Sequence, residues 1–146
     1  TDCMFVITAA GQGTFNKIPL SVQYFLGGMG TVRGYYSAVA VGDVGYCANF
    51  EFYMPPPFLK NRTFKPMKRK WKEIMQILAF IDHGGIYTVD AVEDEIPAAY
   101  LTALGAGLRF YGPHNFSLSF DAGFPVMNQY KDYNSVFYIR LNMDFL

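Results

Sequence analysis

The last stretch of the sequence, residues 137–145, alternates strictly between apolar and polar residues, and this pattern restricts the fold more than any other feature. The apolar set is Phe137, Ile139, Leu141, Met143 and Phe145, and the polar set is Tyr138, Arg140, Asn142 and Asp144. A period of two places these sets on opposite faces of a β-strand. One face of this strand must therefore meet apolar surroundings, and the other must meet polar surroundings.

Five earlier segments also have strand character. They are residues 3–10, 46–54, 74–82, 104–110 and 116–124, of which the first is the least regular and 74–82 is weaker than the rest. Most approach the length of about 9–11 residues that a tilted membrane strand needs, whereas strands of soluble sheets usually have about 5–6. We therefore predict an all-β, antiparallel, membrane-spanning sheet. A soluble β-barrel or β-sandwich binding module is the alternative from another class.

The composition favours the membrane interpretation. Hydrophobic residues make up 51% of the sequence and aromatic residues 18%, but charged residues only 16%, against about 25% in ordinary domains. No apolar run approaches the roughly 20 residues of a membrane-spanning helix. The formal net charge is zero, so there is no bulk electrostatic argument for a nucleic-acid partner.

The connections between the predicted strands differ in character. Residues 83–100 and 125–135 are loop-like, residues 111–115 form a tight turn by their Gly-Pro and Asn content, and 11–43 is the longest connection. The connection 55–72 starts with three prolines and carries seven basic residues, namely Lys60, Arg62, Lys65, Lys68, Arg69, Lys70 and Lys72. Such a run is often a solvated turn, but it could also contact anionic lipid headgroups or an acidic partner.

A glycine-rich segment within the longest connection, residues 25–35, contains a single arginine. It reads Phe-Leu-Gly-Gly-Met-Gly-Thr-Val-Arg-Gly-Tyr, and Gly42-Asp43-Val44-Gly45 follows shortly after. Glycines let a loop turn tightly and let backbones approach each other closely. The segment lacks the glycine spacing and the Gly-Lys-Ser/Thr ending of phosphate-binding loops, so we do not expect nucleotide binding.

Together these motifs resemble the C-terminal barrel region of outer-membrane two-partner secretion transporters. This haemolysin secretion/activation family lies in the superfamily of outer-membrane β-barrel assembly factors. The matching motifs are Phe25-Leu26-Gly27-Gly28, Val32-Arg33-Gly34-Tyr35, Gly42-Asp43-x-Gly45, a strand with Glu51, Phe80-x-Asp82-x-Gly84 and the terminal alternating strand. The resemblance spans essentially the whole chain, residues 1–146. It implies the last six strands of a sixteen-stranded transmembrane barrel, a connection 11–43 that folds back inside, and a periplasmic C-terminus.

The resemblance also implies that Val32, Arg33, Gly34 and Tyr35 form the loop motif and that Arg33 pairs with Asp82. An arginine that leaves water needs an anionic partner, and its planar fork can meet a carboxylate with two hydrogen bonds. From spacing alone, a solvated arginine and a loop-edge aspartate would be the favoured interpretation.

Other charged residues fall on the predicted inner faces of the strands. They are Glu51, Arg109, Asp121, Arg140 and Asp144. Charged residues at membrane depth normally face an interior or a water-filled cavity. Because neither sign dominates, we favour a hydrated, charge-balanced wall over a track that guides substrate. The resemblance identifies the terminal strand, with Phe137, Ile139, Leu141, Met143 and Phe145, as the sorting signal of the barrel.

The sequence shows no pattern typical of an enzyme. His83 and His114 are predicted to lie in a loop and a turn, and no nucleophile has an obvious base. If residues 10 and 44 pair in the first hairpin, Cys3 lies opposite about residue 51 and ~13 Å from Cys47, which is too far for a disulfide. We therefore predict two free cysteines, and we expect neither a cofactor nor a metal.

These observations predict an outer-membrane protein that passes an unfolded exoprotein through its lumen. Its expected partners are the secreted cargo, outer-membrane lipid, the barrel-assembly machinery during biogenesis, and further N-terminal strands of its own barrel. Nucleic acid is not an expected partner. A barrel assembly or insertion factor of the same superfamily is the alternative function.

Overall fold

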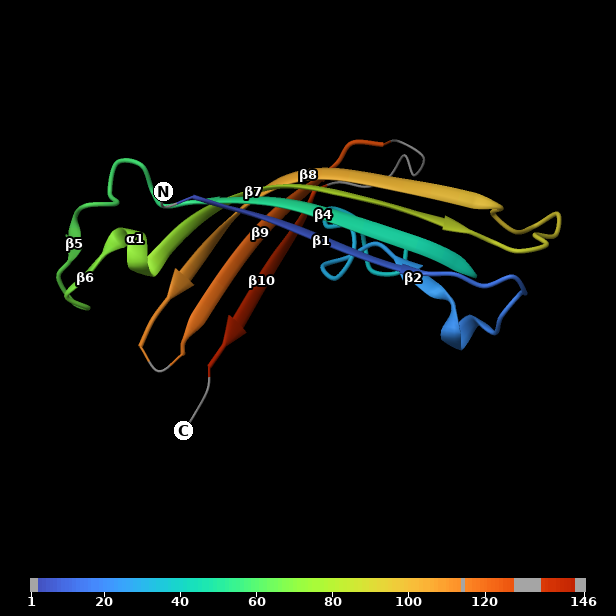
Figure 1. Ribbon diagram of the computed structural model, residues 1–146, viewed down its shortest axis with the longest axis horizontal. Helices are drawn as coiled ribbons and strands as arrows, with labels where there is room; N and C mark the ends of the chain where they lie inside the picture. Colours follow the sequence, from blue (N-terminus) through green and yellow to red (C-terminus); the bar gives the residue numbers. More distant parts are fainter. Residues whose placement is uncertain (1–2, 114, 128–134, 144–146) are drawn as a thin grey trace.

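A computed structural model describes residues 3–113, 115–127 and 135–143. Its main element is a six-stranded antiparallel sheet in the order β1-β4-β7-β8-β9-β10. The strands are β1 (Met4–Gln12), β4 (Val44–Met54), β7 (Met75–Tyr87), β8 (Ala98–Tyr111), β9 (Ser117–Pro125) and β10 (Val136–Asn142). Figure 1 shows a long curved sheet. The prediction of an all-β antiparallel fold is confirmed.

Smaller elements occupy the two longest connections. Between β1 and β4 lie the 3-10 helix η1 (Leu20–Val22) and the paired strands β2 (Tyr24–Leu26) and β3 (Ala40–Gly42). Between β4 and β7 lie the paired strands β5 (Thr63–Phe64) and β6 (Arg69–Lys70) and the one-turn helix α1 (Trp71–Ile74). Figure 1 places these two groups at opposite ends of the sheet. β1 and β10 are its edges, so the sheet is not closed within this chain.

The two faces of the sheet differ in chemistry. On the outer face, a row of aligned apolar side chains crosses five strands and is well exposed. It consists of Ile7, Phe50, Ile81, Leu104 and Phe124, all at least 45% exposed. Monomeric soluble proteins rarely expose a contiguous apolar surface of this kind. The inner face instead carries the acidic and basic residues Glu51, Asp82, Arg109 and Asp121, together with several glycines.

The core lies between the inner face and the segment that joins β2 to β3. From this segment and its flanking strands come Leu26, Val32, Tyr35 and Ala40, and from the sheet come Cys47, Ile86, Ala99, Leu101 and Ala103. Leu26, Val32 and Tyr35 are completely buried. This core therefore lies inside the curve of the sheet, and the outer face supplies none of its residues.

Two strands extend beyond their predicted ends. β7 continues to Tyr87 and β8 begins at Ala98, so the expected loop 83–100 was too long. Alternation fails there because Gly84 and Gly85 interrupt it. The inner face has no room for a side chain at Gly84, because a Cβ there would lie 2.6 Å from Leu26 Cδ1 and 3.3 Å from Val32 Cγ2.

The extension of β7 also corrects the placement of His83, which lies within this strand. Its Nε2 is 3.0 Å from the Tyr46 hydroxyl and its Nδ1 is 2.9 Å from Thr102 Oγ1. Both partners lie on neighbouring strands of the outer face. His114, expected in the turn after β8, is outside the described residues.

The first hairpin has a different register from the one that we assumed. Ala10 pairs with Cys47 and not with Val44, and Met4 pairs with Tyr53, so the assumed register was wrong by three residues. The shift increases the distance between the two cysteines along the strands. Both cysteines are free, Cys3 exposed and Cys47 buried, and Cys47 accepts a hydrogen bond from the Tyr24 hydroxyl at 3.1 Å.

The close packing of Gly34 on Gly123 leads to a stability prediction. A Cβ on Gly123 would lie 2.4 Å from the Gly34 nitrogen, a backbone atom that cannot swing away. We expect Gly123→Ala to lower the free energy of unfolding by about 1–3 kcal/mol, the usual cost of overpacking. Thermal unfolding and the rate of protease cleavage within residues 27–38 measure the effect.

The matched control is Gly30→Ala in the same segment. Nothing lies within 4 Å of a Cβ at Gly30, so this variant should unfold like the unaltered protein. Equal stability of the two variants would contradict the packing of Gly34 against β9.

Candidate functional site

The segment between β2 and β3, residues 27–39, turns inward at its glycines and lies against the inner face of the sheet. Gly27, Gly28 and Gly34 have φ angles of 106°, 95° and 97°, a region that L side chains rarely adopt. The turn is closed by hydrogen bonds from the Gly28 amide to the Val32 carbonyl (3.1 Å) and from the Thr31 amide to the Gly28 carbonyl (3.2 Å). We call residues 27–39 the inner segment.

Arg33 is the centre of the site and pairs with Asp82 on β7. Its Nε donates to Oδ2 at 2.7 Å and its Nη2 donates to Oδ1 at 2.8 Å, while its backbone amide donates to Oδ2 at 3.0 Å. Asp82 is completely buried and Arg33 is 5% exposed. Three hydrogen bonds to one carboxylate are the arrangement that compensates best for removing both charges from water.

Two further acidic groups and one aromatic ring surround the guanidinium. Nη1 of Arg33 lies 2.7 Å from Oε1 of Glu51 on β4 and 3.8 Å from Oδ2 of Asp121 on β9. The guanidinium carbon lies 3.6 Å from the centroid of the Phe80 ring, within the range of a cation–π contact. Burial alone would lower the pKa of Arg33, but the hydrogen bonds and charges of Asp82 and Glu51 outweigh it and raise that pKa.

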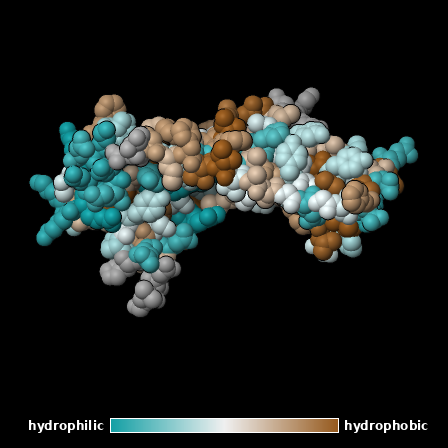
Figure 2. Space-filling view, in the orientation of Figure 1, coloured by the Kyte–Doolittle hydropathy of each residue, from teal (hydrophilic) through white to brown (hydrophobic). Residues whose placement is uncertain are grey.

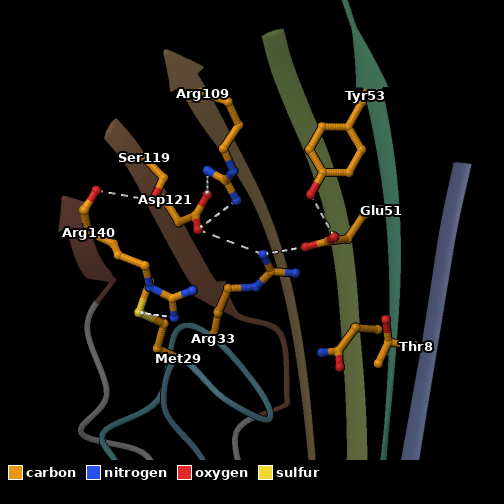
Figure 3. A pocket seen from close by; sticks show the side chains of 10 residues that line it. Thr8, Met29, Arg33, Glu51, Tyr53, Arg109, Ser119, Asp121 and Arg140 are labelled. Carbon is orange, nitrogen blue, oxygen red and sulfur yellow. Dashed lines mark hydrogen bonds and ion pairs between the residues drawn. The ribbon is translucent and has the colours of Figure 1, made fainter. Parts of the chain in front are cut away.

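The charges continue around the wall of a cavity (Figure 3). Arg109 donates to both oxygens of Asp121, at 2.7 and 3.0 Å, and the Tyr53 hydroxyl donates to Oε2 of Glu51 at 2.8 Å. Arg140 lies at the same cavity and contacts Met29 Sδ at 3.2 Å. Within the described residues, three arginines (33, 109 and 140) thus stand near three carboxylates (51, 82 and 121).

The remaining members of the loop motif anchor the inner segment. Val32 and Tyr35 are buried in the core, and Gly34 contacts Gly123. The Tyr35 hydroxyl lies 3.0 Å from the Thr102 carbonyl oxygen and 3.1 Å from that of Met127. Burial raises the pKa of Tyr35 despite these two contacts, so this hydroxyl remains a hydrogen-bond donor.

The terminal strand has the two faces that its alternation predicts. Phe137, Ile139, Leu141 and Met143 are 73, 70, 58 and 48% exposed, and the first three point away from the inner face in β10. Tyr138 points inward and its hydroxyl donates to the Tyr35 carbonyl at 2.9 Å. Asp144 and Phe145 lie outside the described residues.

Sequence reasoning found no hydrogen-bond partner for Asp43, Asn49 or Tyr138, all of which hold the inner segment or its surroundings. Asn49 Nδ2 donates to the Thr31 carbonyl at 2.6 Å. Asp43 is fully buried and accepts from the amides of Ile18 (2.9 Å) and Val89 (2.8 Å) and from Gln23 Nε2 (2.9 Å). The Gly42-Asp43-x-Gly45 motif was the available signal for Asp43, but its partners lie 20 to 46 positions away.

Within the described residues, no helix is long and apolar enough to cross a membrane. No group of three or more His, Cys, Asp or Glu side chains within these residues is arranged to hold a metal ion.

A comparison with protein families matches residues 4–145 to the Omp85 superfamily domain. The chain belongs to the Omp85 superfamily. This is a family of the outer membrane whose members translocate or assemble proteins and are not enzymes. No curated protein matches the sequence significantly. The exposed apolar row of the outer face and the charged residues of the inner face fit a family of the outer membrane.

The buried ion pair leads to a prediction about the inner segment. Asp82→Asn removes the negative charge and leaves Arg33 with one amide oxygen in place of a carboxylate. Breaking a buried pair by removing one partner typically costs about 3–5 kcal/mol, so we expect a clear fall in the unfolding temperature and faster cleavage within residues 27–39. The control is Lys17→Gln, which removes an exposed ion pair with Glu95 and should cost at most about 1 kcal/mol. Equal effects of both variants would contradict the central place of Asp82.

The buried carboxylate of Asp43 leads to a prediction about pH. The donated hydrogen bonds of the Ile18 amide, Gln23 and the Val89 amide hold its pKa below the ordinary value. A depressed pKa adds stability above the ordinary aspartate value of about 3.9, and this stability is lost as the pH falls through the lower, folded-state pKa. We expect the Ile18 and Val89 amides to lose protection from hydrogen exchange in that acidic range.

Asp43→Asn should abolish this acid-dependent step and weaken protection of the same amides at neutral pH. Asp90→Asn is the control, because Asp90 lies in the turn after β7 at a φ of 47°, which asparagine tolerates. Retention of the acid-dependent step in Asp43→Asn would assign the step to another group.

Proposed function

We propose that this chain is the C-terminal part of the barrel of an outer-membrane two-partner secretion transporter. In this proposal an unfolded exoprotein crosses the outer membrane through the lumen, without a nucleotide or other cofactor. The observation that carries the proposal is the inner segment, which lies inside the curve of the sheet and is tied to it through Arg33. Membership of the Omp85 superfamily supports translocation or assembly, and the finer assignment is ours.

The inner segment has contacts suited to a part that can be both held and released. Arg33 reaches three strands, through Glu51 on β4, Asp82 on β7 and Asp121 on β9. Water or a passing polar chain can replace these hydrogen bonds and ion pairs, whereas the apolar packing of Val32 and Tyr35 would have to separate and form again. We propose that the inner segment occupies the lumen at rest and shifts when cargo passes, a two-position behaviour known for other protein switches.

The wall of the cavity is suited to a cargo without a fixed sequence. Arg109 and Asp121 neutralise each other, and Arg33 neutralises Asp82 and approaches Glu51. A balanced, hydrated wall has no strong field that would trap a positive or a negative stretch of an unfolded chain. We therefore propose that Glu51, Arg109, Asp121 and Arg140, together with Asp144, line a neutral passage.

The rest of the barrel must come from outside these residues. Six strands leave two open edges, β1 and β10, and open edges pair with other strands or aggregate. We propose that the six strands are the last of sixteen, with the C-terminus in the periplasm and the connection 11–43 at the extracellular end. The outward residues of β10 then serve as the sorting signal for the barrel-assembly machinery.

A barrel assembly factor of the same superfamily is the alternative function. The short run from Tyr35 to Asp43 resembles the secretion branch more than the assembly branch. The two functions differ in what fails when the protein is impaired. A secretion transporter affects one cargo, whereas an assembly factor lowers the amounts of many outer-membrane barrels.

A charge-exchange series tests the proposal. We expect Arg33→Asp and Asp82→Arg each to reduce cargo secretion at least tenfold, because each leaves like charges facing one another in a buried site. The double variant should recover part of the activity. Recovery should be incomplete because Glu51 and Asp121, which face Arg33 in the unaltered protein, would face an aspartate.

Secreted cargo and the amounts of other outer-membrane barrels are measured in the same cells. The control is the exchange Lys17→Glu with Glu95→Lys, an exposed pair whose reversal should be silent. Normal secretion in both single variants would refute the role of Arg33. Loss of many barrels with every single variant would favour the assembly function.

A further inference from the structure

The connection between β4 and β7 holds most of the basic residues of the sequence. Seven of the twelve lysines and arginines fall within residues 60–72, and no acidic residue does. Figure 1 places β5, β6 and α1 at the end of the sheet opposite β2, and Figure 2 shows hydrophilic residues gathered at that end. We call residues 58–74 the basic hairpin.

The basic hairpin has an ordered backbone and an aromatic base. The Lys60 amide donates to the Pro56 carbonyl at 2.9 Å, and the Trp71 amide donates to the Arg62 carbonyl at 3.0 Å. Phe64 pairs with Arg69 across the two short strands. The rings of Phe64 and Trp71 pack with their centroids 5.0 Å apart. A solvated turn would not need such an apolar pair at its base.

The aromatic base faces an apolar cavity of about 340 Å³ on the outer side of the sheet. The hairpin contributes Phe64, Met67 and Trp71, and the sheet contributes Phe110 and Leu118. Phe110 and Leu118 pair across β8 and β9 and share the face of Leu108 and Phe120, which is the outer face. The cavity is therefore an extension of the apolar outer surface, bounded at one end by the hairpin.

The cationic groups of the basic hairpin have few ion-pair partners of their own. Arg69 pairs with Glu73 at 3.4 Å. Lys60, Arg62, Lys65, Lys68 and Lys70 are exposed and form no ion pair within the described part of the chain. Phe58, next to them in sequence, is 91% exposed. A membrane interface typically contains cations without ion-pair partners and aromatic rings, placed at the end of an apolar band.

We propose that the basic hairpin binds an anionic phospholipid of the inner leaflet. An acyl chain lies in the cavity beside Phe64 and Trp71, and the phosphate of the headgroup lies among Lys60, Lys65, Lys68 and Lys70. The charge complementarity and the continuity of the cavity with the lipid-facing surface favour a lipid over an acidic protein. The choice of leaflet rests on the orientation in the proposed function, whereas binding of the lipid itself does not.

Trp71 is the only tryptophan in the sequence, so its fluorescence reports on the site. The purified protein is reconstituted in phosphatidylcholine vesicles that contain a minor fraction of lipid with brominated chains. The brominated lipid is either phosphatidylglycerol or phosphatidylcholine, and Trp71→Phe supplies the background. We expect brominated phosphatidylglycerol to quench Trp71 roughly twofold more strongly, because basic residues near the surface enrich anionic lipid. High salt should reduce this difference.

The charge variant replaces Lys60, Lys65, Lys68 and Lys70 with glutamine, and its matched control replaces the same four residues with arginine. The glutamine variant should be quenched equally by both lipids, and the arginine variant should keep the preference. Equal quenching of the unaltered protein by both lipids would overturn the selection of anionic lipid. Absence of quenching by either would overturn contact with acyl chains, and would leave an acidic protein as the partner.

The outcome can be separated from that of the proposed function. Quenching is measured in a synthetic bilayer with no cargo and no translocation, and the four lysines do not contact Arg33 or Asp82. If the protein selects phosphatidylglycerol but the Arg33→Asp variant secretes normally, the lipid site is supported and the proposed role of Arg33 in transport is refuted. If both lipids quench Trp71 equally but the Arg33→Asp variant fails to secrete, the transport role is supported and the lipid site is refuted.

Discussion

The removal of the Arg33 charge from water is the constraint on which the rest of the inner face depends. An uncompensated guanidinium in this position would cost far more than the packing around it could return. Asp82 therefore has to be buried on β7 at the right depth, and Glu51 and Phe80 have to stand on either side. The same interaction fixes the depth at which the inner segment meets the sheet, and this in turn shapes the cavity.

Close approach of two backbones makes that interaction possible. Gly84 and Gly123 provide the flat places on the inner face on which Leu26, Val32 and Gly34 rest. A side chain at either glycine would lift the inner segment and lengthen the hydrogen bonds between Arg33 and Asp82. The glycines and the ion pair thus act together. The glycines allow the inner segment to lie close to the sheet, and only this close approach lets Arg33 and Asp82 form short hydrogen bonds.

The two faces of the sheet explain how one chain can hold an ionised interior within an apolar exterior. Period-two alternation assigns each residue of a strand to one face, so outward Phe and Ile residues alternate with inward Glu, Asp and Arg. In the proposed barrel the outer face meets lipid, and the ends of the strands meet the membrane interfaces. The basic hairpin stands at one end of the sheet, and the proposed lipid site places it at the interface and not in the lumen.

The sequence by itself determined the strands, their two faces and the identity of the charged inward residues, because alternation is a local property of each strand. It could not determine which charges meet. Arg33 is 49 positions from Asp82. Both oxygens of Asp121 accept from Arg109, and its Oδ2 also lies 3.8 Å from Nη1 of Arg33. Register also escaped local reasoning: the first hairpin was misaligned by three residues, because residues 3–10 alternate too irregularly to show which of their side chains face outward. The tertiary structure alone decided three further features: the extension of β7 to Tyr87, the position of His83, and the hydrogen bonds to Asp43 from Ile18, Gln23 and Val89. Each of these features depends on residues that lie on neighbouring strands or beneath the sheet. The alternation of apolar and polar residues does not show which distant residues a glycine, histidine or aspartate will contact.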